Sequence, residues 1–281
     1  MVLVIRLFYQ YSALMKESKK ASERLDKVLS HHGFGTRKDV KKLLHTGVVT
    51  INGTLCTTAD AHVDPENDII TVDGEELELR HHLYLMMNKC SNVVCSAKDG
   101  LHSTVFDLLE GAYNHSFLGG DLHMVGRLDI DTEGLLILTT DGKLTHRLTS
   151  PKTHSNKTYL VHLRDSVSDA DKDRYIKACL EGMDIGPEGN EEGFRSEPAQ
   201  LEWLSTQGQY QSEGSRALPC PSAQCLLTIY EGKYHQVKRM FSALGNQVVF
   251  LKRISMGDLQ LDPSLAAGQY RELTPEEVAL L

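Results

Sequence analysis

The sequence lacks the features that mark several large classes of protein. Its net charge is −8 over 281 residues, so the chain as a whole is not a polycation that binds nucleic acid indiscriminately. It has no glycine-rich phosphate loop, and none of its six cysteines forms a C-x-x-C pair. Val2–Phe8 is apolar but far too short to span a membrane. These absences leave a globular protein of ordinary composition.

Two pairs of cysteines share a wider C-x4-C spacing, Cys90 with Cys95 and Cys220 with Cys225. Structural zinc sites favour tighter spacings, and no cluster of histidines accompanies either pair. We therefore expect reduced thiols and no metal site, as in a protein of the cytoplasm.

The N-terminal segment does not fit the pattern of a signal peptide. Arg6 interrupts its apolar run, no basic segment precedes the run, and no small-residue cleavage site follows it. We expect residues 1–22 to be a disordered extension ahead of the folded domains, and we expect the protein to be cytoplasmic.

The length of the chain suggests two domains, and the residue pattern divides them near residue 80. Residues 23–80 form a small unit with two short helices followed by short strands, and residues 83–281 form the larger body. Residues 78–83 are expected to be a short linker between them.

Capping residues and a turn define the small unit. Ser22 is expected to cap a helix that begins at Glu23, and Thr36 is expected to cap a second helix that Gly47 ends. The Asn-Gly pair at 52–53 predicts a β-hairpin among the short strands that follow.

The second helix of this unit carries four basic side chains although the protein is acidic overall: Arg37, Lys38, Lys41 and Lys42. Such a charge run fits either a solvated helix face or a surface that contacts phosphates. The stretch RLDKVLSHHGFGTRKDVKKLLHTGVVTING resembles the S4 RNA-binding domain and covers most of residues 23–80. That resemblance implies an S4-like (αL) fold, with basic side chains set against the backbone and shape of RNA.

In the larger body, apolar strand-like runs alternate with helix-like stretches, without a regular βαβ rhythm. The strand-like runs are LYLMMN, LLILTT, TYLVHL, AQLEWL, CLLTIY and NQVVFLKRI, and the clearest helices cover residues 170–181 and 235–244. We therefore predict an α+β fold with a mixed, largely antiparallel sheet. Residues 186–222 are rich in Gly, Ser, Pro and Glu, and their ends are expected to be surface loops.

The stretch GRLDIDTEGLLILTTDG at 126–142 places Asp129, Asp131 and Glu133 just ahead of a strand with an apolar middle. Loops held by a rigid scaffold are where catalytic groups tend to lie. Each acid also has a purely structural explanation. Asp129 can pair with Arg127, Asp131 can order the turn, and Glu133 can be exposed or in a surface ion pair.

This stretch resembles the signature of the ribosomal pseudouridine synthases of the RsuA type, and further motifs follow in the family's order. They are MNK at 87–89, VCS at 94–96, HRLTSP at 146–151, KTYLV at 157–161, EGKYHQVKRMF at 231–241 and YRELTPEE near the end. So many ordered motifs are far more specific than one short pattern. The chain departs from the family at 90–92, where Cys-Ser-Asn stands in place of the usual Pro and Gly, and residues 206–222 are longer than expected.

The resemblance implies a mixed-sheet catalytic domain that isomerises a uridine already inside RNA, without a metal or a small-molecule cofactor. The C1′–N1 bond breaks, the uracil rotates, and a C1′–C5 bond forms. The HRLTSP and KTYLV motifs fit the small-subunit branch. They imply 16S ribosomal RNA as the substrate, modified at a site of the pseudouridine-516 type within a partly assembled small subunit. We expect the protein to be a monomer.

Carried over residue by residue, the resemblance implies three catalytic side chains, Asp129, Tyr159 and Lys238. Asp129 would attack or deprotonate the ribose, and Lys238 would keep that carboxylate ionised where water is excluded. Tyr159 would offer a flat face on which the loosened uracil can turn. Arg127 would contact the flipped strand, and Arg239 is a further expected RNA contact.

Histidines also stand near these motifs, but an exposed polar position is the simpler interpretation of each. His235, together with Gln236, is expected to support the start of the helix that carries Lys238 or to touch RNA. We assign it no role in proton transfer, although histidine titrates in the physiological range.

Three other functions stay open from the sequence. A synthase of the same family could act on large-subunit 23S RNA, because the branches share their catalytic motifs. A non-catalytic RNA-binding assembly factor could rely on the S4-like unit. A glycosidase built on Asp129 with Asp131 or Glu133 is disfavoured, because residues two or four apart in a strand share one face and are poorly placed to flank a bond.

Overall fold

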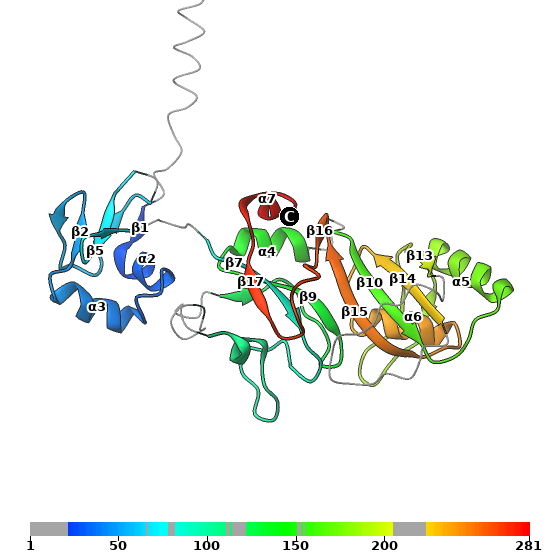
Figure 1. Ribbon diagram of the computed structural model, residues 1–281. Helices are drawn as coiled ribbons and strands as arrows, with labels where there is room; N and C mark the ends of the chain where they lie inside the picture. The colour runs from blue at the N-terminus through cyan, green and yellow to red at the C-terminus, as the bar shows by residue number, and fades with distance from the viewer. Residues whose placement is uncertain are drawn as a thin grey trace, which may run out of the picture. The chain divides into compact units, whose positions relative to one another are not determined.

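The computed structural model describes residues 22–65, 67–77, 82–110, 113, 122–150, 153, 155–204 and 223–281. The chain divides into two compact units, with residues 22–77 in the first and residues 82–109 and 122–281 in the second (Figure 1). The expected extension up to residue 21 and the long stretch at 205–222 lie outside the described residues, as does most of the expected linker. Among the described helices, none is long and apolar enough to cross a membrane.

The described residues of the first unit form two helices and six short strands. The helices are α2 (Leu25–His31) and α3 (Arg37–His45). One sheet has the order β3 (Thr54–Leu55), β2 (Val49–Ile51), β5 (Ile70–Val72), β6 (Glu75–Glu76), and β1 (Glu23–Arg24) pairs with β4 (His62–Val63). Helices and strands share one apolar core, whose fully buried members include Leu25, Leu29, Val40, Leu44 and Ile70.

The starts of the two helices test the capping predictions. Thr36 forms the cap expected for α3, because its hydroxyl accepts from the Asp39 amide at 3.3 Å and its amide donates to the Asp39 carboxylate at 3.2 Å. The prediction for the first helix is wrong. Residues 23–24 are extended and pair with β4, which satisfies their backbone groups, so α2 begins at Leu25 instead of directly after Ser22.

The predicted hairpin is present between β2 and β3, which pair antiparallel. Asn52 and Gly53 have φ angles of +50° and +77°, and positive values at both positions are what the tight hairpin turn requires. The Asn52 side chain also donates a hydrogen bond to the Asp68 carboxylate at 2.8 Å. The local sequence therefore determines this turn.

The second unit is built on a nine-stranded sheet. Its main order is β13 (Gln200–Trp203), β14 (Ala223–Ile229), β10 (Lys157–Leu163), β15 (Val248–Met256), β9 (Glu133–Thr139), β7 (Tyr84–Lys89), β17 (Tyr270–Glu272), with β16 (Leu259–Gln260) on β15 and β8 (His123–Met124) on β9. Of the strand pairs described in this sheet, β9 with β15 is parallel and the rest are antiparallel. The predicted α+β fold with a mixed, largely antiparallel sheet is confirmed.

Helices pack on this sheet at several places (Figure 1). They are η1 (Val105–Leu108), α4 (Gly142–Thr149), α5 (Asp169–Glu181), α6 (Gln236–Ala243) and α7 (Pro275–Ala279), and a small hairpin, β11 (Asp184–Ile185) with β12 (Phe194–Arg195), follows α5. The helices predicted at 170–181 and 235–244 are confirmed as α5 and α6. Helix α4 was not foreseen; the Asp141 carboxylate caps it by accepting from the Lys143 and Leu144 amides.

The parallel junction of β9 and β15 lies directly after the acidic loop. Gly134 of β9 pairs with Arg253 of β15. Gly134 has φ +99°, and a Cβ placed there would lie 2.2 Å from the Arg253 carbonyl oxygen, so only glycine fits. The next four residues of β9 are fully buried, and Leu135 and Ile137 pack with Leu144 and Leu148 of α4. The loop is therefore anchored at the edge of a rigid core.

Candidate active site

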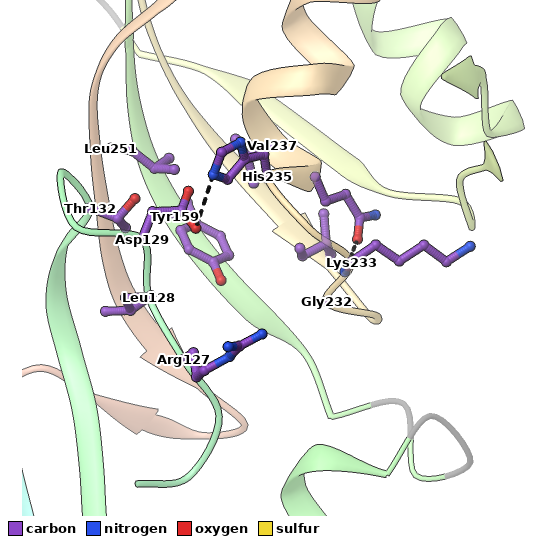
Figure 2. A pocket seen from close by; sticks show the side chains of 12 residues that line it. Arg127, Leu128, Asp129, Thr132, Tyr159, Gly232, Lys233, His235, Val237 and Leu251 are labelled. Atoms are coloured by element: carbon purple, nitrogen blue, oxygen red, sulfur yellow. Dashed lines mark hydrogen bonds and ion pairs between the residues drawn. The ribbon is translucent and has the colours of Figure 1, made fainter. Parts of the chain in front are cut away.

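A pocket opens where the acidic loop before β9 faces β10, β15 and the turn between β14 and α6 (Figure 2). Arg127, Asp129, Tyr159 and His235 all line it. The first two come from the loop, Tyr159 comes from the middle of the sheet, and His235 comes from the start of α6. The tertiary fold thus brings three of the predicted site residues into one cavity.

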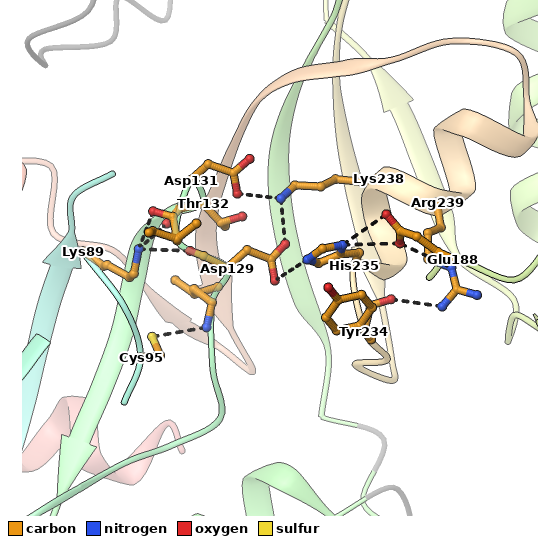
Figure 3. Close-up of polar contacts among 12 residues, drawn as sticks. Lys89, Cys95, Asp129, Asp131, Thr132, Glu188, Tyr234, His235, Lys238 and Arg239 are labelled. Carbon is orange, nitrogen blue, oxygen red and sulfur yellow. Dashed lines mark hydrogen bonds and ion pairs between the residues drawn. The ribbon is translucent and has the colours of Figure 1, made fainter. Parts of the chain in front are cut away.

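Lys238 joins this group through its ion pairs. Its ammonium lies 2.8 Å from the Asp129 carboxylate and 2.6 Å from the Asp131 carboxylate (Figure 3). The Lys238 and Asp129 side chains are 24% and 28% exposed, whereas Asp131 is 61% exposed. Asp129 therefore pairs with Lys238. Asp131 contacts Lys238 as well, so it does more than order its own turn.

The charges in this cluster stabilise one another. Burial acts to raise the pKa of Asp131, but the hydrogen bond and the positive charge of Lys238 outweigh it and lower that pKa below its usual value. Burial acts to lower the pKa of Lys238, and the hydrogen bonds to Asp129 and Asp131 raise it overall. The Lys238 ammonium therefore lies between the two carboxyl groups and favours the ionised form of Asp131, and such a cation is a condition for an anionic group to persist in a partly desolvated pocket.

Lys89 at the end of β7 holds the acidic loop in place through hydrogen bonds. It is fully buried, and its ammonium donates to the carbonyl oxygens of Asp129 at 3.0 Å, Ile130 at 3.3 Å and Thr132 at 2.9 Å (Figure 3). Burial lowers the pKa of Lys89. The sequence analysis placed Lys89 in a family motif but gave it no role. A lysine that directly follows a fully buried strand is the signal that could have identified it.

The turn at 90–92, where the family's Pro and Gly are replaced, also contacts this loop. Asn92 has φ +66°, a left-handed conformation that Asn tolerates better than most residues. Its amide donates to the Ile130 carbonyl at 2.8 Å. Nearby, the Cys95 thiol accepts from the Leu128 amide at 3.4 Å. The departure from the family pattern therefore leaves a turn that still supports the loop.

Tyr159 and Arg127 also line the pocket. Tyr159 is 8% exposed and lies in β10 between Leu227 of β14 and Arg253 of β15, so its ring is part of the pocket wall. Arg127 is exposed and extends along the opening (Figure 2). A flat ring in the wall and an exposed cation at the opening suit a planar base and its phosphates.

His235 lies between two carboxylates, those of Asp129 and Glu188. It precedes α6 with φ +48°, and its ring nitrogens lie 3.3 Å from Glu188 and 3.9 Å from Asp129. His235 and Gln236 both support the start of α6, as expected: the His235 carbonyl accepts from the Arg239 amide at 2.9 Å, and the Gln236 side chain bonds the Lys233 amide at 3.0 Å and Glu231 at 2.7 Å. The contacts of His235 with the Asp129 and Glu188 carboxylates were not foreseen, because Glu188 lies 47 residues away along the chain.

The structure corrects the predicted surroundings of two side chains, Arg239 and Glu133. Arg239 was expected to contact RNA, but it is 6% exposed, and its guanidinium donates to the carbonyl oxygens of Gly186 at 2.7 Å and Glu192 at 2.8 Å. It fastens the segment after β11 to α6, and we do not retain it as an RNA contact. Glu133 was expected at the surface, but it is half-buried as the first residue of β9, and burial raises its pKa.

In the first unit, the four predicted basic contacts all lie on α3 and are exposed: Arg37, Lys38, Lys41 and Lys42. Lys42 is 71% exposed and lies 3.4 Å from the Asp39 carboxylate one turn away. An ion pair of this kind is weak in water. The helix therefore presents a cationic face to solvent.

Comparison with known proteins gives a consistent result. Residues 83–243 match the family described as RNA pseudouridylate synthase. An uncharacterised RNA pseudouridine synthase of Bacillus subtilis is 43% identical over 92% of this chain and 98% of its own length. Ribosomal small subunit pseudouridine synthase A of Pasteurella multocida is 42% identical over 91% of this chain and 98% of its own.

A crystal structure of a pseudouridylate synthase, 39% identical, covers 92% of this chain and 99% of its own with a TM-score of 0.58. The matched region contains the acidic loop, the strand with Tyr159 and the helix with Lys238. The chain therefore belongs to the RNA pseudouridylate synthase family, whose members are isomerases.

Proposed function

We propose that this enzyme converts one uridine of small-subunit (16S) ribosomal RNA to pseudouridine. The observation that carries the proposal is the ion pair of Asp129 with Lys238, in a pocket that Tyr159 also lines. The small-subunit name of a relative that matches over almost its whole length supports the choice of RNA. A partly assembled small subunit is the proposed form of the substrate.

The reaction conserves every atom of the nucleotide. The N1–C1′ bond breaks, the C1′–C5 bond forms, C5 loses its proton, and N1 gains one. The protein must therefore aim an anionic group at the sugar, hold the detached base, and let it turn without losing it to water.

Asp129 is the proposed anionic group. Its carboxylate either attacks C1′ and displaces N1, or removes the proton at C2′ and so expels N1 by elimination. Both routes need an ionised carboxylate, and the Lys238 ammonium at 2.8 Å favours that form. Lys89 holds the backbone carbonyl of Asp129, which limits the directions in which the carboxylate can point.

Tyr159 and Arg127 are proposed to handle the base and the strand. The uridine has to leave its stack to reach the pocket, which costs a few kcal/mol. The Tyr159 ring offers a surface that does not favour one orientation of the uracil over another. Arg127 at the opening would pair with a phosphate of the displaced strand.

The first unit is proposed to bind RNA through the cations of α3. Exposed cations of this kind contact phosphates and read little sequence, so they would position the enzyme on its substrate. We propose a monomer in the cytoplasm that needs neither a metal nor a small-molecule cofactor.

The test is to map pseudouridine in 16S RNA carrying early assembly proteins, by carbodiimide treatment and primer extension. Wild type is expected to produce a new stop, and Asp129→Asn to lose at least about a thousand-fold in rate because the amide can neither attack nor accept a proton. Asp131→Asn is the matched control. It removes the other carboxylate on Lys238, which is 61% exposed, and should cost no more than about ten-fold.

Other outcomes would select among the alternatives. Modification confined to 23S RNA would move the enzyme to the large-subunit branch. Full biological activity of Asp129→Asn would indicate an RNA-binding assembly factor whose catalysis is dispensable. Release of free uracil would indicate a glycosidase.

A further inference from the structure

An exposed aromatic ring next to the pocket has no part in the reaction as described. Tyr234 is 47% exposed, although a large aromatic side chain is usually more buried. Its ring stacks on the His235 imidazole, with the ring centroids 3.7 Å apart and the planes inclined by 24° (Figure 3). The stack covers part of the Tyr234 ring, and nearly half of the side-chain surface stays open to solvent.

The backbone and the neighbours of this stack hold it in place. His235 adopts φ +48°, which residues other than glycine rarely do, and its ring nitrogen lies 3.3 Å from Glu188. The carbonyl of Tyr234 accepts a hydrogen bond from Arg239 at 3.3 Å. Arg239 is itself buried and bonded to the segment that carries Glu188. The stack is therefore ordered before any ligand arrives.

The stack leads outward from the reacting group. His235 lines the pocket, and its ring lies 3.9 Å from the Asp129 carboxylate. Tyr234 is the next ring beyond His235, outside the residues that line the pocket. Lys233, also exposed, and Arg127 line the same pocket and supply positive charge beside the stack.

We propose that Tyr234, backed by His235, is a second base-binding subsite, which stacks an unpaired nucleobase adjacent to the target uridine in the RNA strand. The inference rests on the proposed function. A uridine that flips out of its stack leaves its neighbours without a stacking partner. Aromatic side chains take up such bases with little sequence preference. Lys233 and Arg127 would meet the phosphates on either side.

The first experiment measures kinetics on the RNA that wild type modifies. Tyr234→Leu is expected to raise KM about 5- to 50-fold, within the range for one lost base–aromatic stack, and to leave kcat within about two-fold. Tyr234→Phe keeps the ring and should match wild type within about two-fold. Leu180→Ala, at another exposed apolar side chain on α5, is the control. An unchanged KM for Tyr234→Leu, or equal losses for Leu and Phe, would overturn the inference.

A second measurement does not depend on how well the leucine variant folds. RNA with an abasic nucleotide on one side or the other of the target is bound to Asp129→Asn protein, which retains Tyr234. One of the two abasic RNAs is expected to bind about 5- to 50-fold more weakly than intact RNA. Adding Tyr234→Leu to the protein should weaken the binding of that abasic RNA little further, because both changes remove the same contact. Equal affinity of both abasic RNAs and intact RNA would overturn the subsite.

Failure of this inference differs from failure of the proposed function. Pseudouridine formed by wild type, with no effect of Tyr234→Leu and none of the abasic RNAs, would remove the subsite and leave the proposed function intact. Absence of pseudouridine in 16S and 23S RNA with wild type would remove both.

Discussion

The two units use their basic side chains in opposite ways. On α3 of the first unit the cations are exposed, and Lys42, 71% exposed, lies beside a single carboxylate of its own helix. In the second unit Lys238, 24% exposed, lies between two carboxylates more than a hundred residues away, and Lys89 is fully buried. An exposed cation acts through its charge and is screened by salt, whereas an enclosed cation acts through its position. Substitutions should therefore have graded effects on α3 and large effects in the pocket.

Among these cations, replacement of Lys238 is expected to have the largest effect on catalysis. In Lys238→Met, Asp129 and Asp131 lose the cation that both contact, so the pKa of Asp131 is no longer lowered and the Asp129 carboxylate loses its orientation. We expect kcat to fall about 100- to 1,000-fold, as for the loss of one fixed charge-stabilising group, with RNA affinity nearly unchanged. Single-turnover kinetics measures this, and Lys238→Arg serves as the charge-preserving control. A loss confined to RNA affinity would show that Lys238 behaves like the α3 cations.

Replacing Lys89 tests how much stability and activity depend on a buried cation whose described hydrogen bonds go to backbone carbonyl oxygens. Lys89→Met removes the donor to the three carbonyl oxygens of the acidic loop. We expect the free energy of unfolding to fall by about 2–4 kcal/mol and kcat by about 10- to 100-fold, because buried carbonyls are left unsatisfied and Asp129 is no longer fixed. Chemical denaturation and kinetics on the same preparation measure both. A stable variant with full kcat would mean that the loop holds its shape without Lys89.

The α3 cations should show the smaller, additive behaviour of exposed charges. We expect Lys38→Gln with Lys41→Gln to weaken RNA binding about 3- to 10-fold at physiological salt and to reduce the salt dependence of affinity by about one to two units of slope. At saturating RNA, kcat should be unchanged. Lys177→Gln makes the same charge change on α5, where the side chain is 75% exposed, and is the control. An equal loss with that control would argue against a specific role for α3.

The pH dependence of stability gives the smallest effect. Lys238 lowers the pKa of Asp131, so the folded state favours the ionised carboxyl more than the unfolded state does. The resulting stabilisation of the folded state is present at pH values above the pKa of an ordinary Asp, about 4. It disappears as the pH falls through the lowered pKa of Asp131 in the folded state. Because Asp131 is 61% exposed, we expect less than about 1 kcal/mol. Acid unfolding of Asp131→Asn against wild type measures it, and a larger gap would mean that the cluster is better shielded from water.

Residues near one another in the chain account for what could be predicted. The capping box of Thr36 with Asp39 and the turn at 52–53 follow from local patterns, because their partners are three residues apart or less. The pattern of apolar runs likewise identified α5, α6 and six of the nine strands of the large sheet, and it did not identify the short strands β8, β16 and β17. The prediction failed at Glu23, where pairing with a distant strand overrode a local helix signal.

The sequence by itself was enough to nominate the candidate catalytic side chains, since the resemblance of several ordered motifs pointed to Asp129, Tyr159 and Lys238 before any contact was known. Only the tertiary structure decided their surroundings. Lys89 holds a loop 40 residues away, Lys238 meets Asp129 across 109 residues, and Arg239 is buried against a segment about 50 residues earlier. Such contacts depend on which strands lie side by side in the sheet, and local sequence patterns carry no information about that pairing.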